Sequence, residues 1–193
     1  MARQQAMART QMKSAGDEFP NELPKQHEVV RGILVRKAMP GFRHSVLQRR
    51  LSARLDAFDG KQRTPGGWWL ATECEIELFA GERYLPDLAG WKIDAIRERP
   101  VAARVRIPPH WVCEILSPST ADRDLGDKHE TYYRAHIPHY WIVDLNAPAL
   151  TVLRWTEGGY RSIATAGPGE CTGLEPFQAV ELDIDQLFEL DRW

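Results

Sequence analysis

Glu114 is the residue whose setting most strongly suggests chemistry. It stands inside an apolar run, residues 111–116 (WVCEIL). The length of this run and its β-forming residues predict a central, buried strand. An ionised carboxylate in such a strand is costly unless a cation or several hydrogen-bond donors compensate its charge. Glu114 is therefore expected to have a partner.

A second carboxylate, Asp87, directly follows Tyr84-Leu85-Pro86. If this segment and the strand of Glu114 lie side by side, the two carboxylates repel each other, and a hard divalent cation relieves the repulsion. Such an ion coordinates a phosphate oxygen and activates a water molecule. The pair predicts a Mg²⁺ site, which Mn²⁺ would also occupy, with Asp87 and Glu114 as ligands.

Two further side chains are candidates for the same site. Lys128 precedes Tyr132 by four residues and would share one face of a helix with it. Its ammonium would stabilise negative charge on an attacked phosphate without binding the metal. His44 opens the first long helix and is an auxiliary candidate, either as a ligand or as a phosphate contact.

Each of these residues also has a purely structural interpretation. Asp87 after proline suits a turn, Glu114 could pair with a core arginine, Lys128 could be a solvated helix lysine, and His44 could cap its helix. Three alternating glutamates would form a solvated strand face, although one of them could join the metal site: Glu73, Glu75 and Glu77.

The elements that must position these residues follow from hydrophobic periodicity. Helices are expected at residues 44–58, 122–134 and 185–190. Strands are expected at residues 68–79, 84–91, 111–116 and 140–143, with hairpins at residues 28–35 and 150–164. This order predicts an α/β (α+β) fold, a mixed β-sheet flanked by helices in a single domain.

Composition narrows the class of protein. The chain has 193 residues, of which 43% are hydrophobic and 27% charged, and lacks an apolar run long enough to cross a bilayer. The three cysteines are scattered singly, which argues against a zinc–thiolate site and a disulfide framework. Residues 1–18 are expected to be a disordered leader before one domain at 19–193, and a cytoplasmic location is expected. The net charge of −2 differs from that of strongly basic DNA binders.

Several stretches occur together in a pattern known from one family. They are Pro86-Asp87, residues 113–120 (CEILSPST), Asp124 with Lys128 and Tyr132, and residues 140–144 (YWIVD), with Gly32 and His44 upstream. In these stretches, over roughly residues 20–190, the chain resembles the Uma-two-type restriction endonucleases of the PD-(D/E)xK superfamily.

The resemblance implies a restriction-endonuclease-like core with Asp87 and Glu114 as metal ligands and Lys128 as the catalytic lysine. It departs from the superfamily at Leu116, where a lysine normally stands two residues after the strand carboxylate. The expected activity is Mg²⁺-dependent cleavage of DNA phosphodiester bonds by a homodimer, and the same chemistry would serve RNA. The alternative, motivated by Leu116 and the mild net charge, is a catalytically idle DNA-binding or protein-interaction module on the same fold.

Overall fold

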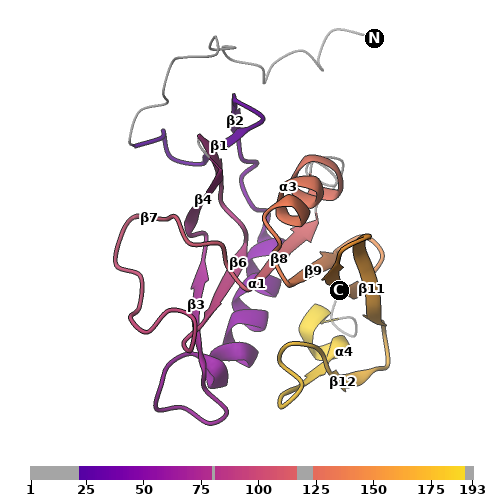
Figure 1. Ribbon diagram of the computed structural model, residues 1–193. Coiled ribbons are helices and arrows are strands. Elements are labelled where there is room, and N and C mark those ends of the chain that lie inside the picture. The colour runs from indigo at the N-terminus through magenta and orange to yellow at the C-terminus, as the bar shows by residue number, and fades with distance from the viewer. Residues whose placement is uncertain (1–21, 80, 117–123, 190–193) are drawn as a thin grey trace, which may run out of the picture.

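The computed structural model describes residues 22–79, 81–116 and 124–189 (Figure 1). Its strands are β1 (His27–Val30), β2 (Ile33–Arg36), β3 (Trp68–Thr72), β4 (Glu75–Phe79), β5 (Glu82–Tyr84), β6 (Leu88–Lys92), β7 (Arg104–Val105), β8 (Trp111–Leu116), β9 (His139–Asp144), β10 (Ala149–Thr156), β11 (Gly159–Ala166), β12 (Cys171–Gly173) and β13 (Glu181–Asp183). Its helical elements are α1 (Phe42–Leu55), η1 (Asp56–Phe58), η2 (Asp124–Lys128), α3 (His129–Arg134) and α4 (Ile184–Phe188).

The strands form two larger sheets and one small ribbon. The six-stranded sheet has the order β11-β10-β9-β8-β6-β3, and the five-stranded sheet has the order β2-β1-β5-β4-β7. In the larger sheet β8 runs parallel to β9 and antiparallel to β6. All six residues of β8 are buried, as expected for a central strand. The expected mixed-sheet α/β fold is confirmed.

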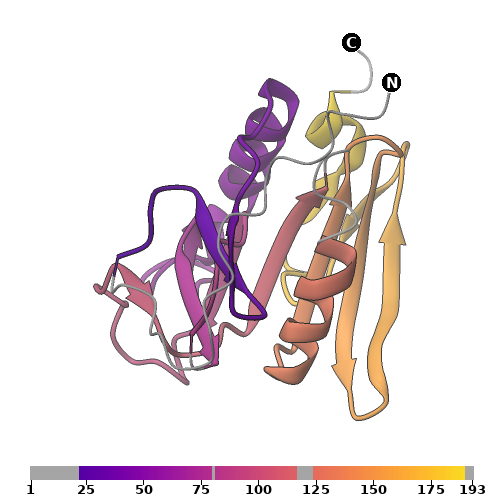
Figure 2. The same cartoon turned by 90° about the horizontal axis from the view of Figure 1, so that it is seen from above.

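Helices cover both faces of the six-stranded sheet. Figure 2 shows α1 and α4 on one side of β8 and α3 on the other. The side chains of β8 alternate between these faces: Trp111, Cys113 and Ile115 join the core beneath α1 and α4, whereas Val112 joins the core beneath α3. Glu114 follows the same alternation and is therefore directed toward α3.

The prediction of one continuous strand at residues 68–79 is wrong. The chain breaks at Glu73, whose φ of 52° lies in the left-handed region, so β3 and β4 belong to different sheets. The expected strand at residues 84–91 divides similarly into β5 and β6. The two breaks lie together, since the amide of Glu73 donates to the carbonyl of Asp87 at 3.3 Å. This junction between sheets contains part of the predicted site.

The other expected elements are found with small shifts of their ends. α1 starts before His44 and ends at Leu55, where η1 continues to Phe58. The expected helix at residues 122–134 is observed as the π-helical turn η2 followed by α3, and residues 122 and 123 lie outside the described residues. The predicted leader at residues 1–18 also lies outside them.

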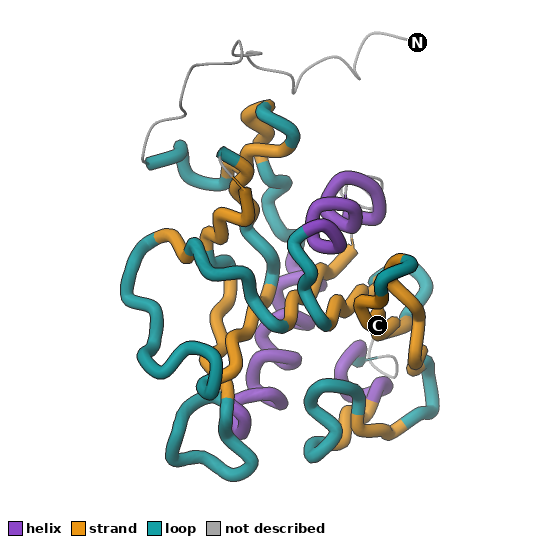
Figure 3. The backbone as a smooth tube through the Cα atoms, viewed as in Figure 1, coloured by secondary structure: helices purple, strands orange, loops and turns teal. Residues whose placement is uncertain are grey.

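Loops join the two sheets, and the largest of these connections is residues 93–103 between β6 and β7 (Figure 3). No described helix is long and apolar enough to span a membrane. The cysteines Cys74, Cys113 and Cys171 are free, and only Cys113 of these three is buried.

Candidate functional site

Strand register brings the two predicted metal ligands together. In the antiparallel pair of β6 and β8, Leu88 faces Cys113 and Ala89 faces Val112. Asp87 directly precedes β6, and continuing this register by one residue places it next to Glu114 on the neighbouring strand. The backbone amide of Ile115 donates to Asp87 Oδ2 at 2.7 Å, which ties the two positions directly.

Asp87 is 2% exposed, and both of its carboxylate oxygens accept hydrogen bonds. Lys37 Nζ lies 2.8 Å from Oδ1, and His44 Nε2 lies 3.1 Å from Oδ2, which also accepts from the amide of Ile115. Burial alone would raise the pKa of Asp87, but the hydrogen bond from His44 and the charge of Lys37 hold that pKa well below its usual range. Asp87 is therefore an ionised, buried carboxylate.

Glu114 is 1% exposed and is held from the α3 side of the sheet. Lys128 Nζ donates to its Oε2 at 2.9 Å, and the hydroxyl of Tyr132 donates to its Oε1 at 2.7 Å. The same ammonium lies 3.1 Å from Oε1 of the buried Glu28, which also accepts from the amide of Leu85. Glu28 and Glu114 thus share one lysine.

The helix geometry explains why Lys128 and Tyr132 reach one carboxylate. They are four residues apart, Lys128 at the end of η2 and Tyr132 within α3, so their side chains project from the same face. Tyr132 is fixed by edge-on contacts with the rings of Tyr84 and Tyr140. Burial and the charge of Glu114 raise the pKa of Tyr132 well above its usual value, so its hydroxyl stays protonated and donates. The prediction that Lys128 and Tyr132 share a helical face is confirmed.

Lys37 and Glu73 also belong to this cluster, although the sequence did not single out Lys37. Lys37 Nζ donates to Glu73 Oε2 at 2.9 Å and to the carbonyl oxygen of Leu85 at 2.7 Å, besides Asp87. Burial alone would lower the pKa of Lys37, but the charges of Asp87 and Glu114 outweigh it and raise that pKa. Lys37 is therefore a second buried ammonium next to the carboxylate pair.

His44 enters the site from the first turn of α1. Its side chain is buried against Asp87, and Gln48, one turn later, donates to the carbonyl oxygen of Asp87 at 2.8 Å. Gln48 also contacts Glu73 at 3.3 Å. His44 Nδ1 is buried and has no hydrogen-bond partner among the described residues. The N-terminal half of α1 therefore positions Asp87 through its side chain and its backbone.

The remaining predicted residues separate into two groups. Glu73 lies at the site, whereas Glu75 and Glu77 form ion pairs with Arg104, and Glu77 also pairs with Arg106. Glu73 is thus the one of the three glutamates that lies at the predicted site, and Glu75 and Glu77 are partly buried and salt-bridged. Leu116 is 3% exposed, so the end of β8 carries an apolar side chain at that position. Of the motif residues, 117–120 lie outside the described residues.

Asp87 and Glu114 are the residues that could hold a hard divalent ion. Asp87 is ionised, and the negative charges of the carboxylate pair are balanced in this structure by lysine ammoniums. Within the described residues no three His, Cys, Asp or Glu side chains are grouped to hold a metal. Mg²⁺ is commonly held by one or two carboxylates together with water, so two carboxylates meet its requirement.

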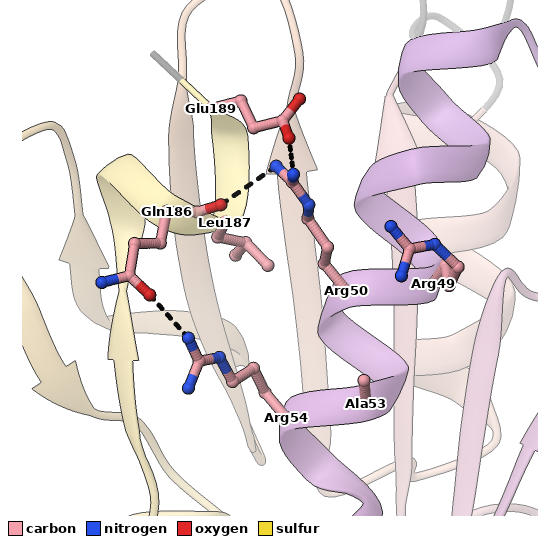
Figure 4. A pocket seen from close by; sticks show the side chains of 7 residues that line it. All are labelled: Arg49, Arg50, Ala53, Arg54, Gln186, Leu187 and Glu189. Atoms are coloured by element: carbon pink, nitrogen blue, oxygen red, sulfur yellow. Dashed lines mark hydrogen bonds and ion pairs between the residues drawn. The ribbon is translucent and has the colours of Figure 1, made fainter. Parts of the chain in front are cut away.

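A separate hollow of about 530 Å³ lies between α1 and α4 (Figure 4). Arg50 pairs with Glu189 and donates to the carbonyl of Gln186 at 3.1 Å, and Arg54 donates to the Gln186 side chain at 2.7 Å. Its lining residues are Arg49, Arg50, Ala53, Arg54, Gln186, Leu187 and Glu189. None of them belongs to the carboxylate cluster, so this hollow is a basic surface apart from the predicted chemistry.

Comparison with known proteins identifies the fold and the family of this chain. The fold matches a crystal structure described as a "putative nuclease belonging to DUF820 from Anabaena variabilis" with a TM-score of 0.69 and 20% sequence identity, covering 84% of this chain and 89% of that chain. The architecture is thus that of a nuclease-like fold. A family model described as "Putative restriction endonuclease" (Uma2) matches residues 17–185. The chain belongs to this family, which confirms the resemblance seen in the sequence and supports a nuclease function. A search of curated proteins found no match.

Proposed function

We propose that the protein is a Mg²⁺-dependent endodeoxyribonuclease whose centre is the Asp87–Glu114 pair. The observation that carries this proposal is the register of β6 and β8, which brings two buried carboxylates to neighbouring positions of adjacent chain segments in a member of a restriction endonuclease family. Two neighbouring carboxylates repel each other, so a purely structural ion pair has no need of the second carboxylate. A site that binds a divalent cation does need both.

In this proposal Asp87 and Glu114 hold the ion, which when bound supplies Lewis acidity and an activated water for phosphodiester hydrolysis. Lys128 and the hydroxyl of Tyr132 fix the orientation of Glu114, since each donates to a different oxygen of its carboxylate. His44, in the first turn of α1, fixes Asp87 by contacting its Oδ2. These contacts pre-organise the carboxylates before substrate binds.

Lys128 carries a positioning role in this account. Its side chain is 0% exposed and its ammonium lies between Glu28 and Glu114. An enclosed ammonium balances the charge of those carboxylates and keeps Glu114 in place. Direct stabilisation of the attacked phosphate by Lys128, which the sequence favoured, stays a prediction, and the variant Lys128→Met in the Discussion separates the two roles.

One observation favours the second candidate function, a catalytically idle module. Leu116 replaces the lysine that the superfamily carries two residues after the strand carboxylate, and the enclosed Lys128 does not restore an exposed ammonium there. A module of this kind would bind DNA and leave it intact. The two candidates therefore differ in cleavage and agree in binding.

The test is cleavage of supercoiled plasmid DNA by purified protein with Mg²⁺ or Mn²⁺, with EDTA as the negative condition. The matched control is Glu114→Gln, which keeps the size and polarity of the side chain and removes its charge. Metal-dependent nicking by wild type that Glu114→Gln lacks supports the nuclease. Equal nicking by both proteins indicates a contaminant, and intact DNA bound by both proteins supports the idle module.

We also propose a homodimer, in which two sites would address the two strands of DNA. Light scattering during size-exclusion chromatography measures this directly. A mass near twice the 22.1 kDa of the chain supports the dimer, and a mass near 22.1 kDa contradicts it.

A further inference from the structure

Lys37 is the side chain whose position the proposed mechanism leaves unexplained. Its ammonium donates to three oxygens, Asp87 Oδ1 at 2.8 Å, Glu73 Oε2 at 2.9 Å and the carbonyl of Leu85 at 2.7 Å. An ammonium has three donors and no acceptor, so this arrangement uses all of its hydrogen-bonding capacity. Lys37 therefore occupies a complete cage of oxygens at the junction of the two sheets.

The contacts of Asp87 determine where a metal ion could bind it. Oδ2 already accepts from His44 Nε2 and from the amide of Ile115, and each carboxylate oxygen has about two lone-pair sites. Among the described residues, Oδ1 accepts from Lys37 alone. A cation that binds Asp87 must therefore use Oδ1, the oxygen that the ammonium of Lys37 already holds.

We propose that Lys37 is a tethered counter-ion that a divalent metal must displace from Asp87, so that Lys37 sets the metal affinity of the site. This inference rests on the metal role of Asp87 given under Proposed function. Two cations on one carboxylate oxygen repel each other strongly in a buried setting. The ammonium can leave toward solvent, because the neighbouring Glu73 side chain is 31% exposed whereas Asp87 is 2% exposed.

The position of Lys37 distinguishes it from Lys128. Lys128 contacts Glu28 and Glu114 and is completely buried, whereas Lys37 retains 8% exposure of its side chain. Lys37 follows β2 in the segment that leads into α1, outside the six-stranded sheet that contains β8. Displacement by a metal is therefore expected of Lys37 and not of Lys128.

The test is Mn²⁺ affinity, measured by electron paramagnetic resonance of free Mn²⁺, for wild type, Lys37→Met and the control Lys61→Met. Removing the competing charge should tighten Mn²⁺ binding by Lys37→Met about tenfold or more. Lys61 lies away from the cluster, near the ring of Trp69, so Lys61→Met should bind as wild type does. A merely structural Lys37 predicts the opposite sign, because a loosened site binds metal more weakly.

A measurement on the wild type keeps the inference testable if Lys37→Met does not fold. Mn²⁺ should free Lys37 and increase its labelling by an amine-reactive reagent, read by peptide mass spectrometry, while the labelling of Lys61 stays constant. Unchanged or slower labelling of Lys37, or Mn²⁺ binding by Lys37→Met no tighter than wild type, overturns the inference. If wild type cuts no DNA but Lys37→Met still binds Mn²⁺ more tightly than wild type, the inference about Lys37 stands and the proposed nuclease activity is rejected.

Discussion

Replacing Lys128 with methionine is expected to destabilise the protein strongly. The change keeps most of the apolar stem and removes a 0% exposed ammonium that lies 2.9 Å from Glu114 and 3.1 Å from Glu28. Both carboxylates are buried, so each would lose its shared counter-charge. Breaking a buried ion pair from one side costs about 3–5 kcal/mol. For a chain of this length that corresponds to a fall in melting temperature of about 6–20 °C.

The assay is urea unfolding in EDTA, followed by the fluorescence of the buried tryptophans Trp111 and Trp141. The double variant Lys128→Met with Glu114→Gln removes one of the two stranded charges. It should recover at least about 1 kcal/mol relative to the sum of the single changes, which is the coupling expected of contacting residues. Lys61→Met serves as the control for loss of a lysine charge at a distant position.

A destabilisation by Lys128→Met below about 1 kcal/mol, the value of a surface pair, would refute the argument from burial. If the variant were also at least about a hundredfold slower in single-turnover cleavage, Lys128 would act on the phosphate, as the sequence suggested. A large loss of stability with cleavage within threefold of wild type in the folded fraction would instead limit Lys128 to balancing buried charge in the fold, with no role in positioning Glu114 for cleavage.

Three further predictions concern other parts of the molecule. Mn²⁺ at a hundredfold excess over its Kd should raise the melting temperature of wild type by about 5–11 °C, and Asp87→Asn should abolish this rise. An equal rise in wild type and variant would contradict the assignment of Asp87 as a metal ligand. Burial lowers the pKa of His129 in the folded protein. Neutral His129 therefore contributes to the stability of the fold above the unfolded-state pKa of about 6.5, and this contribution is lost as the pH falls through the folded-state pKa. His129→Phe, which keeps contacts with Tyr140 and Tyr160, should therefore flatten the loss of stability between about pH 7 and pH 5, and an unchanged slope would contradict this. Arg49→Ala should weaken binding to all DNA sequences alike. It should also reduce by about one the slope of the logarithm of the binding constant against the logarithm of the salt concentration, and an unchanged slope would exclude a phosphate contact.

The centre of the site could be predicted because its residues violate local patterns. A carboxylate within the apolar strand β8 indicates a partner regardless of what surrounds it, and the four-residue spacing of Lys128 and Tyr132 fixes a shared helical face. Glu28 carried no comparable signal, because residues 28–30 of β1 are all buried and show no alternation of burial.

The junction between the sheets could not be predicted in this way. The alternation from Trp68 to Phe79 is almost continuous, and period-two patterns contain no information on whether a chain stays in one sheet. The break at Glu73 depends on a left-handed backbone conformation at a non-glycine residue. The Glu73 side chain contacts Lys37 and Gln48 at this break. Lys37 lies in a segment without periodicity, so its place in the site depends on tertiary contacts distant in sequence.

The central claim, a divalent metal at the Asp87–Glu114 pair, is tested most directly by anomalous diffraction from a crystal soaked in Mn²⁺. The account predicts one anomalous peak within coordination distance of Asp87 and Glu114 carboxylate oxygens, about 2.0–2.6 Å. The Lys37 ammonium should have moved away from Asp87 Oδ1. An ion bound elsewhere, or none at a Mn²⁺ concentration that supports DNA cleavage, would contradict the claim.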